Sequence, residues 1–307
     1  MEKETSKKIS SEKKATIVST SVAAFLTVMK LTIGVASGSV AVLASAIDST
    51  LDMFVSLFNY FAINTSEKPA DSIFNYGRGK VEALASVIEG VVISLSGFFL
   101  LYTAFQKYIN DEVSTYVDIS LIVMVISLFI TLMLVAYLNA VAKKTNNMVI
   151  KADALHYKTD VYANGAVLLS LLLVFLTGNE IFDIIIGGAI SIYIIYSSYE
   201  LIEEGVFVLL DRSLDEETTQ KIVAILDESK DINDYHFLKT RTAGNNNFVD
   251  VHLVFDCVMS LMEAHRRADK IEDKIKLIDT KQEWIINIHM DPYDDSDINN
   301  KENCIIE

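Results

Sequence analysis

The sequence is poor in cysteine, with only Cys257 and Cys304 among its 307 residues. Two thiols are too few for a disulfide framework or for a zinc site built from thiolates, so we interpret both as unpaired thiols in a reducing cytosol. Positive charge is also scarce, because 26 Lys and Arg face 41 Asp and Glu, which gives a net charge of -15. This balance argues against a nucleic-acid partner and is compatible with cationic ligands.

Two further absences narrow the class of protein. The chain contains neither a His-Glu-x-x-His motif nor a Gly-x-Ser-x-Gly motif, which carry zinc peptidase and serine hydrolase chemistry. The first residues, 1–14, are rich in lysine and lack the small-residue pattern of a cleavage site. We therefore expect a protein that is not an enzyme, with 1–14 retained as a cytoplasmic tail.

Hydrophobic residues make up 51% of the chain and are concentrated before about residue 210. This distribution predicts a membrane domain at 15–207, a soluble domain at 208–292 and a disordered acidic tail at 293–307. Each apolar run is long enough to cross a hydrocarbon core of roughly 30 Å as a helix. The predicted all-α membrane domain has six spans, at about 15–36, 40–63, 81–105, 117–141, 148–176 and 181–201.

An even number of spans places both termini on one side of the membrane. The basic residues of the connecting segments lie on the side of the lysine-rich tail, and they are Lys68, Arg78, Lys80, Lys143, Lys144 and Lys151. The opposite loops offer little beyond Lys107. By the positive-inside rule, we expect both termini in the cytoplasm.

The second and fifth predicted spans carry ionisable residues in pairs. Asp48 and Asp52 are four residues apart, as are His156 and Asp160, so each pair shares one face of a helix. Ionisable side chains are costly in a membrane and normally face a cavity, a partner or a transported ion. Two like charges at this spacing also repel unless a cation or protons neutralise them. We therefore expect the two helices to close these four ligands around one ion.

One imidazole nitrogen and three carboxylates suit a tetrahedral divalent transition metal. Zinc fits this geometry best, and Fe²⁺, Cd²⁺ and Mn²⁺ remain possible because the order of affinities does not choose the metal. A lone histidine between packed helices is usually a hydrogen-bonded structural residue, but Asp160 on the same face favours a ligand role for His156. Asp153 is placed one face away from His156 and is left out of the ligand set.

Other polar or small residues in the spans receive weaker interpretations. Glu89 and Asp183 are candidates for proton relay, although an acidic residue near a membrane boundary more often reaches interfacial water. Lys30 is expected near a polar cavity or snorkelling to the interface, with no assigned role. Gly187 and Gly188 are expected to permit close packing of helices.

The composition turns soluble after Arg212. The predicted elements are a helix capped by Ser213 or Asp215 and ending near 227, strands at about 235–241 and 248–255, a helix at 261–278 and a strand at 283–290. The order α-β-β-α-β predicts a small two-layer α/β domain.

The remaining histidines all lie in this soluble domain, and they are His236, His252, His265 and His289. His289 and Asp291 are two residues apart in a strand and point to one side, which suits half of a metal site. His236 and His252 lie on the two preceding strands and are placed to reach the same region or its symmetry mate across a dimer. The alternative is that these are surface histidines, because no short motif fixes them.

The motifs together resemble the cation diffusion facilitator family, and especially its bacterial zinc and ferrous-iron efflux members. The resemblance covers about 15–292 and includes the six spans and the α-β-β-α-β domain, which is ferredoxin-like and metallochaperone-like. Its motifs, in chain order, are Asp48-x-x-x-Asp52, Pro69-Ala-Asp71, Gly77-x-Gly79-Lys80, His156-x-x-x-Asp160, Leu209-Leu-Asp211-Arg212 and His289-Met-Asp291-Pro292.

The resemblance implies a homodimer, embedded in the lipid of a bacterial inner membrane, that exports divalent metal from the cytosol in exchange for protons. The predicted substrate is Zn²⁺, with Fe²⁺ or Cd²⁺ as alternatives. The transport site of each protomer would consist of Asp48, Asp52, His156 and Asp160.

Three further sites are implied by the family. A regulatory zinc site at the interface of the soluble domains would map to His236, His252, His289 and Asp291, with His265 joining. Lys80 and Asp211 stand at the positions of an ion pair that locks the protomers. The family's loop site uses one Asp and two histidines, whereas this chain keeps Asp71 but has Phe74 and Arg78 in the other places. We therefore expect the loop site to be absent or much weakened.

Two other functions fit part of the sequence. A non-transporting metal sensor or scaffold would keep the histidines of the soluble domain without needing four intramembrane ligands. An integral-membrane metalloenzyme would need an open coordination position and a general base. The presence of both predicted metal sites favours transport, with alternating access as the expected mechanism by family analogy.

Overall fold

The computed structural model describes residues 10–37, 40–110, 118–177 and 181–294. The chain forms two compact units, Met1–Val206 and Phe207–Glu307. The predictions made for residues 1–9, for residues 295–307 and for Cys304 fall outside the described residues.

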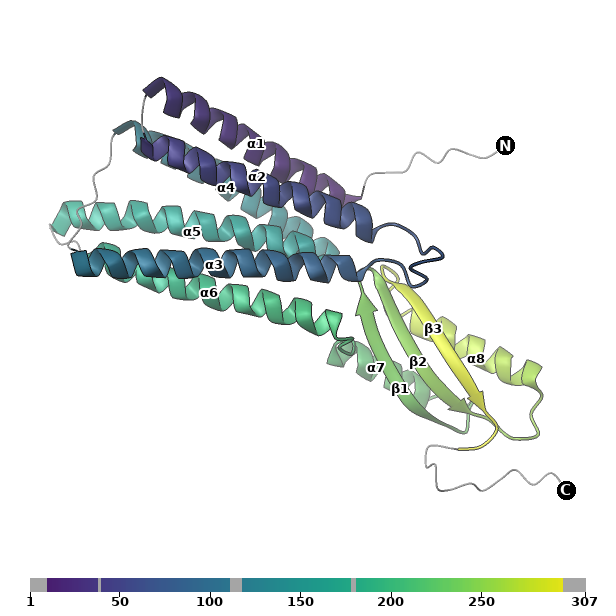
Figure 1. The fold of residues 1–307 in the computed structure, drawn as a ribbon. Helices are drawn as coiled ribbons and strands as arrows, with labels where there is room; N and C mark the ends of the chain where they lie inside the picture. Colours follow the sequence, from purple (N-terminus) through teal and green to yellow (C-terminus); the bar gives the residue numbers. More distant parts are fainter. Residues whose placement is uncertain (1–9, 38–39, 111–117, 178–180, 295–307) are drawn as a thin grey trace, which may run out of the picture. The chain divides into compact units, whose positions relative to one another are not determined.

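Six long helices build the described part of the first unit, and they run side by side (Figure 1). They are α1 (Ser11–Ser37), α2 (Val40–Ser66), α3 (Lys80–Asn110), α4 (Asp118–Thr145), α5 (Met148–Thr177) and α6 (Ile181–Leu209). α1 lies along α2, and α5 packs against α2, α3 and α4. α5 also contacts α1, so polar groups on α5 have four neighbouring helices from which partners can come.

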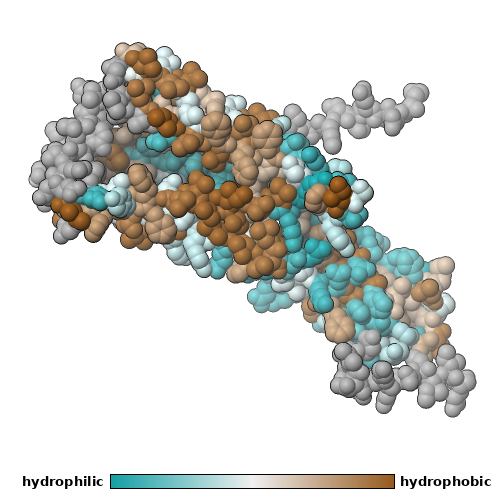
Figure 2. All heavy atoms as spheres, viewed as in Figure 1, coloured by the Kyte–Doolittle hydropathy of each residue, from teal (hydrophilic) through white to brown (hydrophobic). Residues whose placement is uncertain are grey.

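Four of the helices are long and apolar enough to cross a membrane, as judged from the described residues. They are α1 over Ser11–Ala36, α3 over Lys80–Gln106, α4 over Ile122–Thr145 and α6 over Ile184–Leu209. Large apolar side chains such as Phe25, Leu95 and Phe129 are exposed on these helices, and Figure 2 shows hydrophobic residues gathered over them. An apolar exterior of this extent suits lipid, so the first unit is a helical membrane domain.

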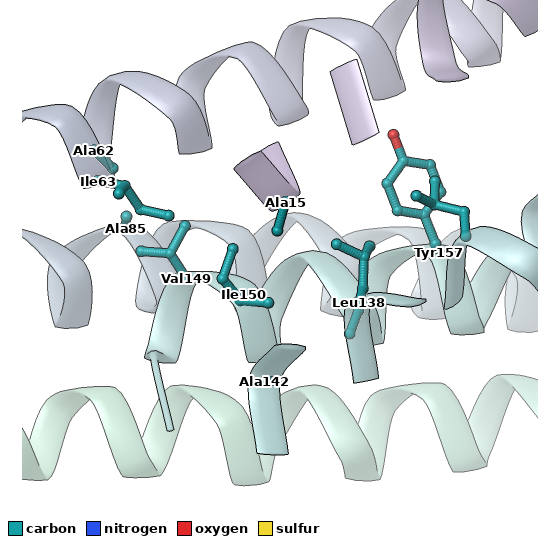
Figure 3. Close-up of a cluster of buried hydrophobic side chains, with 11 residues drawn as sticks. Ala15, Ala62, Ile63, Ala85, Leu138, Ala142, Val149, Ile150 and Tyr157 are labelled. Carbon is teal, nitrogen blue, oxygen red and sulfur yellow. The ribbon is translucent and has the colours of Figure 1, made fainter. Parts of the chain in front are cut away.

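Small side chains fill the interior of the membrane domain. Ala15, Ala62, Ala85, Ala142 and Ala154 are buried in one cluster with larger residues from α2, α4 and α5 (Figure 3). Small residues let helix backbones approach closely, which is the main source of helix association in lipid. This packing fixes how α2 and α5 are rotated, and so where their polar side chains point.

α3 and α6 approach closely at glycines. A Cβ atom on Gly90 would lie 2.7 Å from Ile202 Cγ1. A Cβ atom on Gly205 would lie 2.6 Å from Val87 Cγ2 and 3.1 Å from the carbonyl oxygen of Ala83. Neither position has room for a methyl group, so the two helices depend on glycine for their separation.

The expectation that Gly187 and Gly188 permit close packing is wrong within this chain. A Cβ atom on Gly187 would lie 3.8 Å from Ala104 Cβ, and one on Gly188 would meet nothing within 4 Å. Glycine content does not show which face of a helix meets a neighbour, and for this reason Gly90 and Gly205 were not identified from the sequence.

The second unit is a three-stranded sheet with two helices. Its elements are α7 (Glu216–Asp227), β1 (Asp234–Ala243), β2 (Asn246–Val254), α8 (Leu261–Lys276) and β3 (Glu283–Asp291). The central strand β2 pairs with β1 in antiparallel and with β3 in parallel orientation, and α8 makes the crossover. Of the two caps expected for α7, Asp215 is the one observed, since its side chain accepts from the Thr218 amide.

The two faces of this sheet differ. Val249, Val251 and Leu253 of β2 are buried in a cluster with apolar residues of α7 and α8. Because alternate residues of a strand point to opposite faces, Asp250 and His252 lie on the other face. That second face is available for polar chemistry.

We predict opposite effects for the same substitution at two glycines of α6. Gly205→Ala places a methyl group against α3, and overpacking costs about 1–3 kcal/mol, so the thermal unfolding midpoint in detergent should fall by roughly 5 °C. Gly188→Ala meets nothing within 4 Å and gains helix propensity, so its midpoint should stay or rise. Equal midpoints for the two variants would contradict the close packing at Gly205.

Candidate metal centres

Three residues of α2 and α5 converge inside the membrane domain. Asp52, His156 and Asp160 each offer one ligand atom, and these atoms lie within 4.8 Å of one another. His156 Nε2 lies 3.1 Å from Asp52 Oδ1. His156 and Asp160 share a face of α5 because they are four residues apart, and the packing of α5 on α2 brings that face to Asp52. We call these three residues the membrane centre.

Asp48 lines the same cavity as the membrane centre. The cavity has a volume of about 490 Å³, and its lining includes all four predicted ligands. Asp48 does not belong to the group whose ligand atoms lie within 4.8 Å of one another. It is one helical turn from Asp52, and its side chain is exposed. The role of Asp48 as a fourth ligand stays a prediction.

Lys30 of α1 brings a positive charge to this cavity. Its Nζ donates hydrogen bonds to Ser49 Oγ at 2.8 Å and to the Ser45 carbonyl oxygen at 3.4 Å. Of the two places expected for this side chain, the structure shows the polar cavity. The ammonium group offsets part of the negative charge of the cavity and repels a metal cation that enters it.

A second polar set, Asn59, Glu89 and Asp153, is buried between α2, α3 and α5. Asn59 Nδ2 donates to Glu89 Oε2 at 3.0 Å and to Asp153 Oδ1 at 3.2 Å. Glu89 is only 2% exposed, so the expectation that such a residue reaches interfacial water is wrong here. Asp153 is outside the membrane centre. The side chain of Asp183 is not among those that the structure describes.

In the second unit, three histidines form a row across the open face of the sheet. His236 of β1 pairs with His252 of β2, which pairs with His289 of β3. Asp291 Oδ2 lies 2.9 Å from His252 Nδ1 and 3.4 Å from His236 Nε2, and Asp291 Oδ1 lies 3.1 Å from His289 Nε2. We call these four residues the sheet centre. His236, His252 and Asp291 form its core, since their ligand atoms lie within 4.8 Å of one another.

A bulge in β1 accompanies this row of histidines. The register shifts between His236 and Lys239, so that two residues of β1 face a single residue of β2. Phe237, inside the bulge, has a φ of 51°, which is uncommon for a bulky residue. Its ring lies edge-on to His236, with ring centroids 4.8 Å apart. Bulges re-aim side chains next to functional sites, and this one adjoins the sheet centre.

His265 does not lie with the sheet centre of its own chain, and its expected role at the interface between protomers stays a prediction. It is exposed on α8, and its Nε2 lies 3.7 Å from Asp269 Oδ2. α8 packs on the apolar face of the sheet, opposite to His252.

Asp71, in the segment between α2 and α3, is engaged in hydrogen bonds. Its Oδ1 accepts from the amides of Phe74 at 2.8 Å and Ile73 at 2.9 Å, and its Oδ2 accepts from the Arg78 guanidinium. The Phe74 amide, followed by the Arg78 side chain, holds the pKa of Asp71 below its usual value. The bonds occupy the oxygens that a metal ion would need. Asp71 belongs to neither ligand group found in the described residues.

Lys80 and Asp211 belong to different units of the chain. Lys80 begins α3, and Asp211 follows α6 and accepts a hydrogen bond from Arg241 Nη1 at 3.3 Å. Their expected pairing as a lock between protomers stays a prediction.

The fold and the two centres together define a class of protein. Apolar helices that hold carboxylates and an imidazole around a cavity, followed by an α/β domain with a His and Asp centre, are features of a membrane protein that handles metal cations. Residues 16–210 match the cation efflux transmembrane domain, and residues 214–293 match the cytoplasmic domain of cation efflux proteins. The chain belongs to the cation efflux family, the cation diffusion facilitators, whose members are transporters and not enzymes.

Curated relatives match both parts of the chain. The cation-efflux pump FieF of Serratia proteamaculans is 35% identical over 263 residues, which cover 86% of this chain and 87% of the relative. FieF of Yersinia pestis is 36% identical over 260 residues, which cover 85% of this chain and 86% of the relative. A solved zinc form of CzrB, described as a candidate zinc transporter, is 32% identical, covers 27% of this chain and 92% of its own, and has a TM-score of 0.25.

The hydrogen bonds of Asp71 predict a low titration midpoint for its carboxyl group. The pKa of Asp71 is lowered in the folded protein. The hydrogen bonds therefore stabilise the folded loop fully at pH values above the ordinary pKa of Asp, and this stabilisation is lost as the pH falls through the lowered pKa. Carboxyl-carbon NMR should show a midpoint below the ordinary value. Arg78→Gln should raise it partly, because both backbone donors remain.

Lys68→Gln is the matched control, because it removes a basic side chain from the same segment without touching Asp71. It should leave the midpoint nearly unchanged. A midpoint in the unmodified protein at or above the ordinary Asp value would contradict the hydrogen-bonded arrangement.

Proposed function

We propose that this chain exports a divalent transition metal from the cytoplasm in exchange for protons. Zinc is the substrate we favour, with Fe²⁺ and Cd²⁺ as alternatives. The observation that carries this proposal is the membrane centre itself, where Asp52, His156 and Asp160 converge beside a cavity in the membrane domain. One imidazole nitrogen with carboxylate oxygens is a ligand set for borderline divalent metals such as zinc.

The exchange for protons follows from the chemistry of these ligands. A metal ion needs a neutral imidazole and ionised carboxylates, whereas the ion-free centre favours proton uptake by the same groups. Metal and protons therefore compete for one set of side chains. Asp48, one turn from Asp52 in the same cavity, is the fourth ligand of the proposed transport site.

A transporter of this kind has six spans, which include α2 and α5. These helices contain 27 and 30 residues, so at 1.5 Å per residue they are about 40 Å and 45 Å long and exceed a hydrocarbon core of roughly 30 Å. Lys143 and Lys144 lie in the last turn of α4. Together with the basic segment between α2 and α3, they orient both termini to the cytoplasm of a bacterial inner membrane.

The sheet centre is the proposed regulatory metal site, and the protein works as a homodimer. His236, His252, His289 and Asp291 supply zinc ligands on the open face of the sheet, a face that a second protomer can cover. Lys80 and Asp211 act in the proposed lock between protomers. The loop site at Asp71 is absent, because Arg78 and two backbone amides already engage this carboxylate.

Removal of a membrane-centre ligand should abolish transport. In vesicles reconstituted with the full chain, Asp52→Ala or His156→Ala should reduce zinc flux by about 100-fold or more. Loss of a residue that only hydrogen-bonds to a metal ligand already lowers metal affinity or activity by about 10–100-fold. Glu217→Ala is the control, because Glu217 is exposed on α7 and belongs to neither metal centre, and its flux should be unchanged. Undiminished flux in Asp52→Ala would refute the site. Absence of flux in the unmodified protein would favour a metal sensor or scaffold instead.

Removal of the central carboxylate should empty the sheet centre. In a chain that also carries Asp52→Ala, Asp291→Asn should lower the zinc bound per protomer at equilibrium dialysis. Asp250→Asn makes the same change on the same face of the sheet, where Asp250 accepts a hydrogen bond from Asn287 at 3.1 Å, and it should bind as much zinc as its parent. Equal zinc binding by Asp291→Asn and Asp250→Asn would exclude Asp291 as a ligand.

A further inference from the structure

The polar set of Asn59, Glu89 and Asp153 lies next to the membrane centre, with Asn59 and Asp153 on the same two helices and Glu89 on α3. Asp153 precedes His156 by three residues on α5, a rise of about 4.5 Å. Asn59 follows Asp52 by seven residues on α2, which is two turns and keeps both on one face. α2 and α5 run in opposite directions, so both steps lead toward the end of the bundle that contains Ser66 and Met148.

The set contains two buried carboxyl groups with few partners. Glu89 and Asp153 are 2% and 0% exposed. Both accept from the NH₂ group of Asn59, and Asp153 Oδ1 lies 3.4 Å from Ser56 Oγ. Glu89 Oε1, Asp153 Oδ2 and Asn59 Oδ1 have no hydrogen-bond partner among the described residues. Two ionised carboxylates with only neutral donors, away from water, repel each other and lack solvation.

We propose that Glu89 and Asp153 hold one exchangeable proton between them, positioned by Asn59, and release it when a divalent metal ion binds at the membrane centre. One proton removes the repulsion between the carboxylates. It also turns one carboxylate oxygen into a donor, so that the pair no longer consists of acceptors alone. Release breaks a single O–H bond, passes the proton through the hydroxyl groups of Ser56 and Tyr157 to water in the cavity that Tyr157 lines, and leaves both carboxylates ionised.

A proton suits this set better than a second metal ion does. The amide nitrogen of Asn59, which is not a metal ligand, points at both carboxyl groups. In the part of the chain that the structure describes, neither Glu89 nor Asp153 belongs to a group of three ligand atoms within 4.8 Å. The set therefore offers two carboxylates and a donor, which is a proton site and an incomplete metal site.

Hydroxyl groups connect the proton site with the surroundings of the membrane centre. Ser56 Oγ lies 2.7 Å from Tyr157 Oη and 3.4 Å from Asp153 Oδ1. The Tyr157 ring lies edge-on to His156, with ring centroids 5.5 Å apart. A chain of hydroxyls thus leads from the carboxyl pair to the residue beside a metal ligand.

The charges around the pair explain why metal binding should release the proton. From α5 the pair faces His156; from α2 it faces the neutral groups of Asn59 and Ser56; and from α1 the neighbour is the neutral hydroxyl of Ser19. A divalent ion at the membrane centre adds positive charge within this group, which favours ionised carboxylates. By reciprocity, loss of the proton strengthens metal binding.

The inference rests on the proposed function and is tested by counting protons. Full-length protein in phospholipid vesicles, with zinc and pH indicators inside, gives the number of protons exchanged per zinc ion. Glu89→Gln and Asp153→Asn preserve the shape of each side chain and remove its titration. Zinc flux should persist in both variants, and the number of protons per zinc ion should fall by up to one in each.

Glu82→Gln is the matched control on α3. It is the same substitution two turns away on the same helix, where Glu82 Oε1 accepts from Ser66 Oγ at 2.7 Å. Its proton count should equal that of the unmodified protein. A fall of equal size in this control overturns the inference, because the effect would then belong to any carboxylate of α3.

The remaining outcomes separate the inference from the proposed function. If the unmodified protein exchanges protons, and Glu89→Gln and Asp153→Asn exchange the same number per zinc ion, only the inference is overturned. Zinc flux without proton exchange in the unmodified protein overturns both. Loss of one bound zinc ion per protomer in Glu89→Gln, at equilibrium dialysis, identifies a metal site and overturns the proton site. Failure of both isosteric variants to fold also counts against it, because a pair that already holds a proton tolerates one neutral isostere.

Discussion

The burial of ionisable groups between α2 and α5 is the constraint on which the rest of the membrane domain depends. A carboxylate inside an apolar bundle is stable only beside a cation, a proton or donors that replace water. Close packing through small residues brings α5 near α2 and α3, and this proximity gives Asp52 its contact with His156 at 3.1 Å. In the proposed transport site the same cost favours a divalent ion, because such an ion supplies two charges at one point and replaces several weaker partners. Lys30 in the cavity limits this attraction, which favours release as well as binding.

The two centres use similar ligands but are built by different kinds of secondary structure. In the membrane centre, His156 and Asp160 are aligned by the period of one helix, and a second helix supplies Asp52. In the sheet centre, the alignment comes from strand pairing, since His236, His252 and His289 occupy one row across three strands. A row of this kind fixes ligand positions without requiring burial of the whole site. The buried carboxylate of Asp291 beneath more accessible imidazoles is the result.

Residue spacing in the sequence predicted which side chains share a face of one helix or strand. It could not predict the contacts that depend on how helices and strands pack against one another. Four-residue steps were enough to place His156 and Asp160 on one face, and strand alternation was enough to pair His289 with Asp291. The burial of Glu89 depends on how α3 is rotated against α2 and α5, and the hydropathy of a span carries no such information. The separation of His265 from the sheet centre of its own chain could not be predicted either, because a list of histidines does not show that α8 covers the opposite face of the sheet. Likewise, the closest approach of α6 occurs at Gly205, one of several glycines that look equivalent in sequence.

Charge balance in the bundle argues for coupled exchange and against a simple pore. The described cavity and the adjoining polar set contain the carboxyl groups of Asp48, Asp52, Asp160, Glu89 and Asp153, with the basic groups of Lys30 and His156. If all the carboxylates were ionised and the metal ion departed, negative charge would exceed positive charge in a region of low dielectric. Protons are the cations that can enter in its place without a dedicated coordination sphere. In the proposed exchange, departure of the metal and arrival of protons are therefore two parts of one electrostatic event.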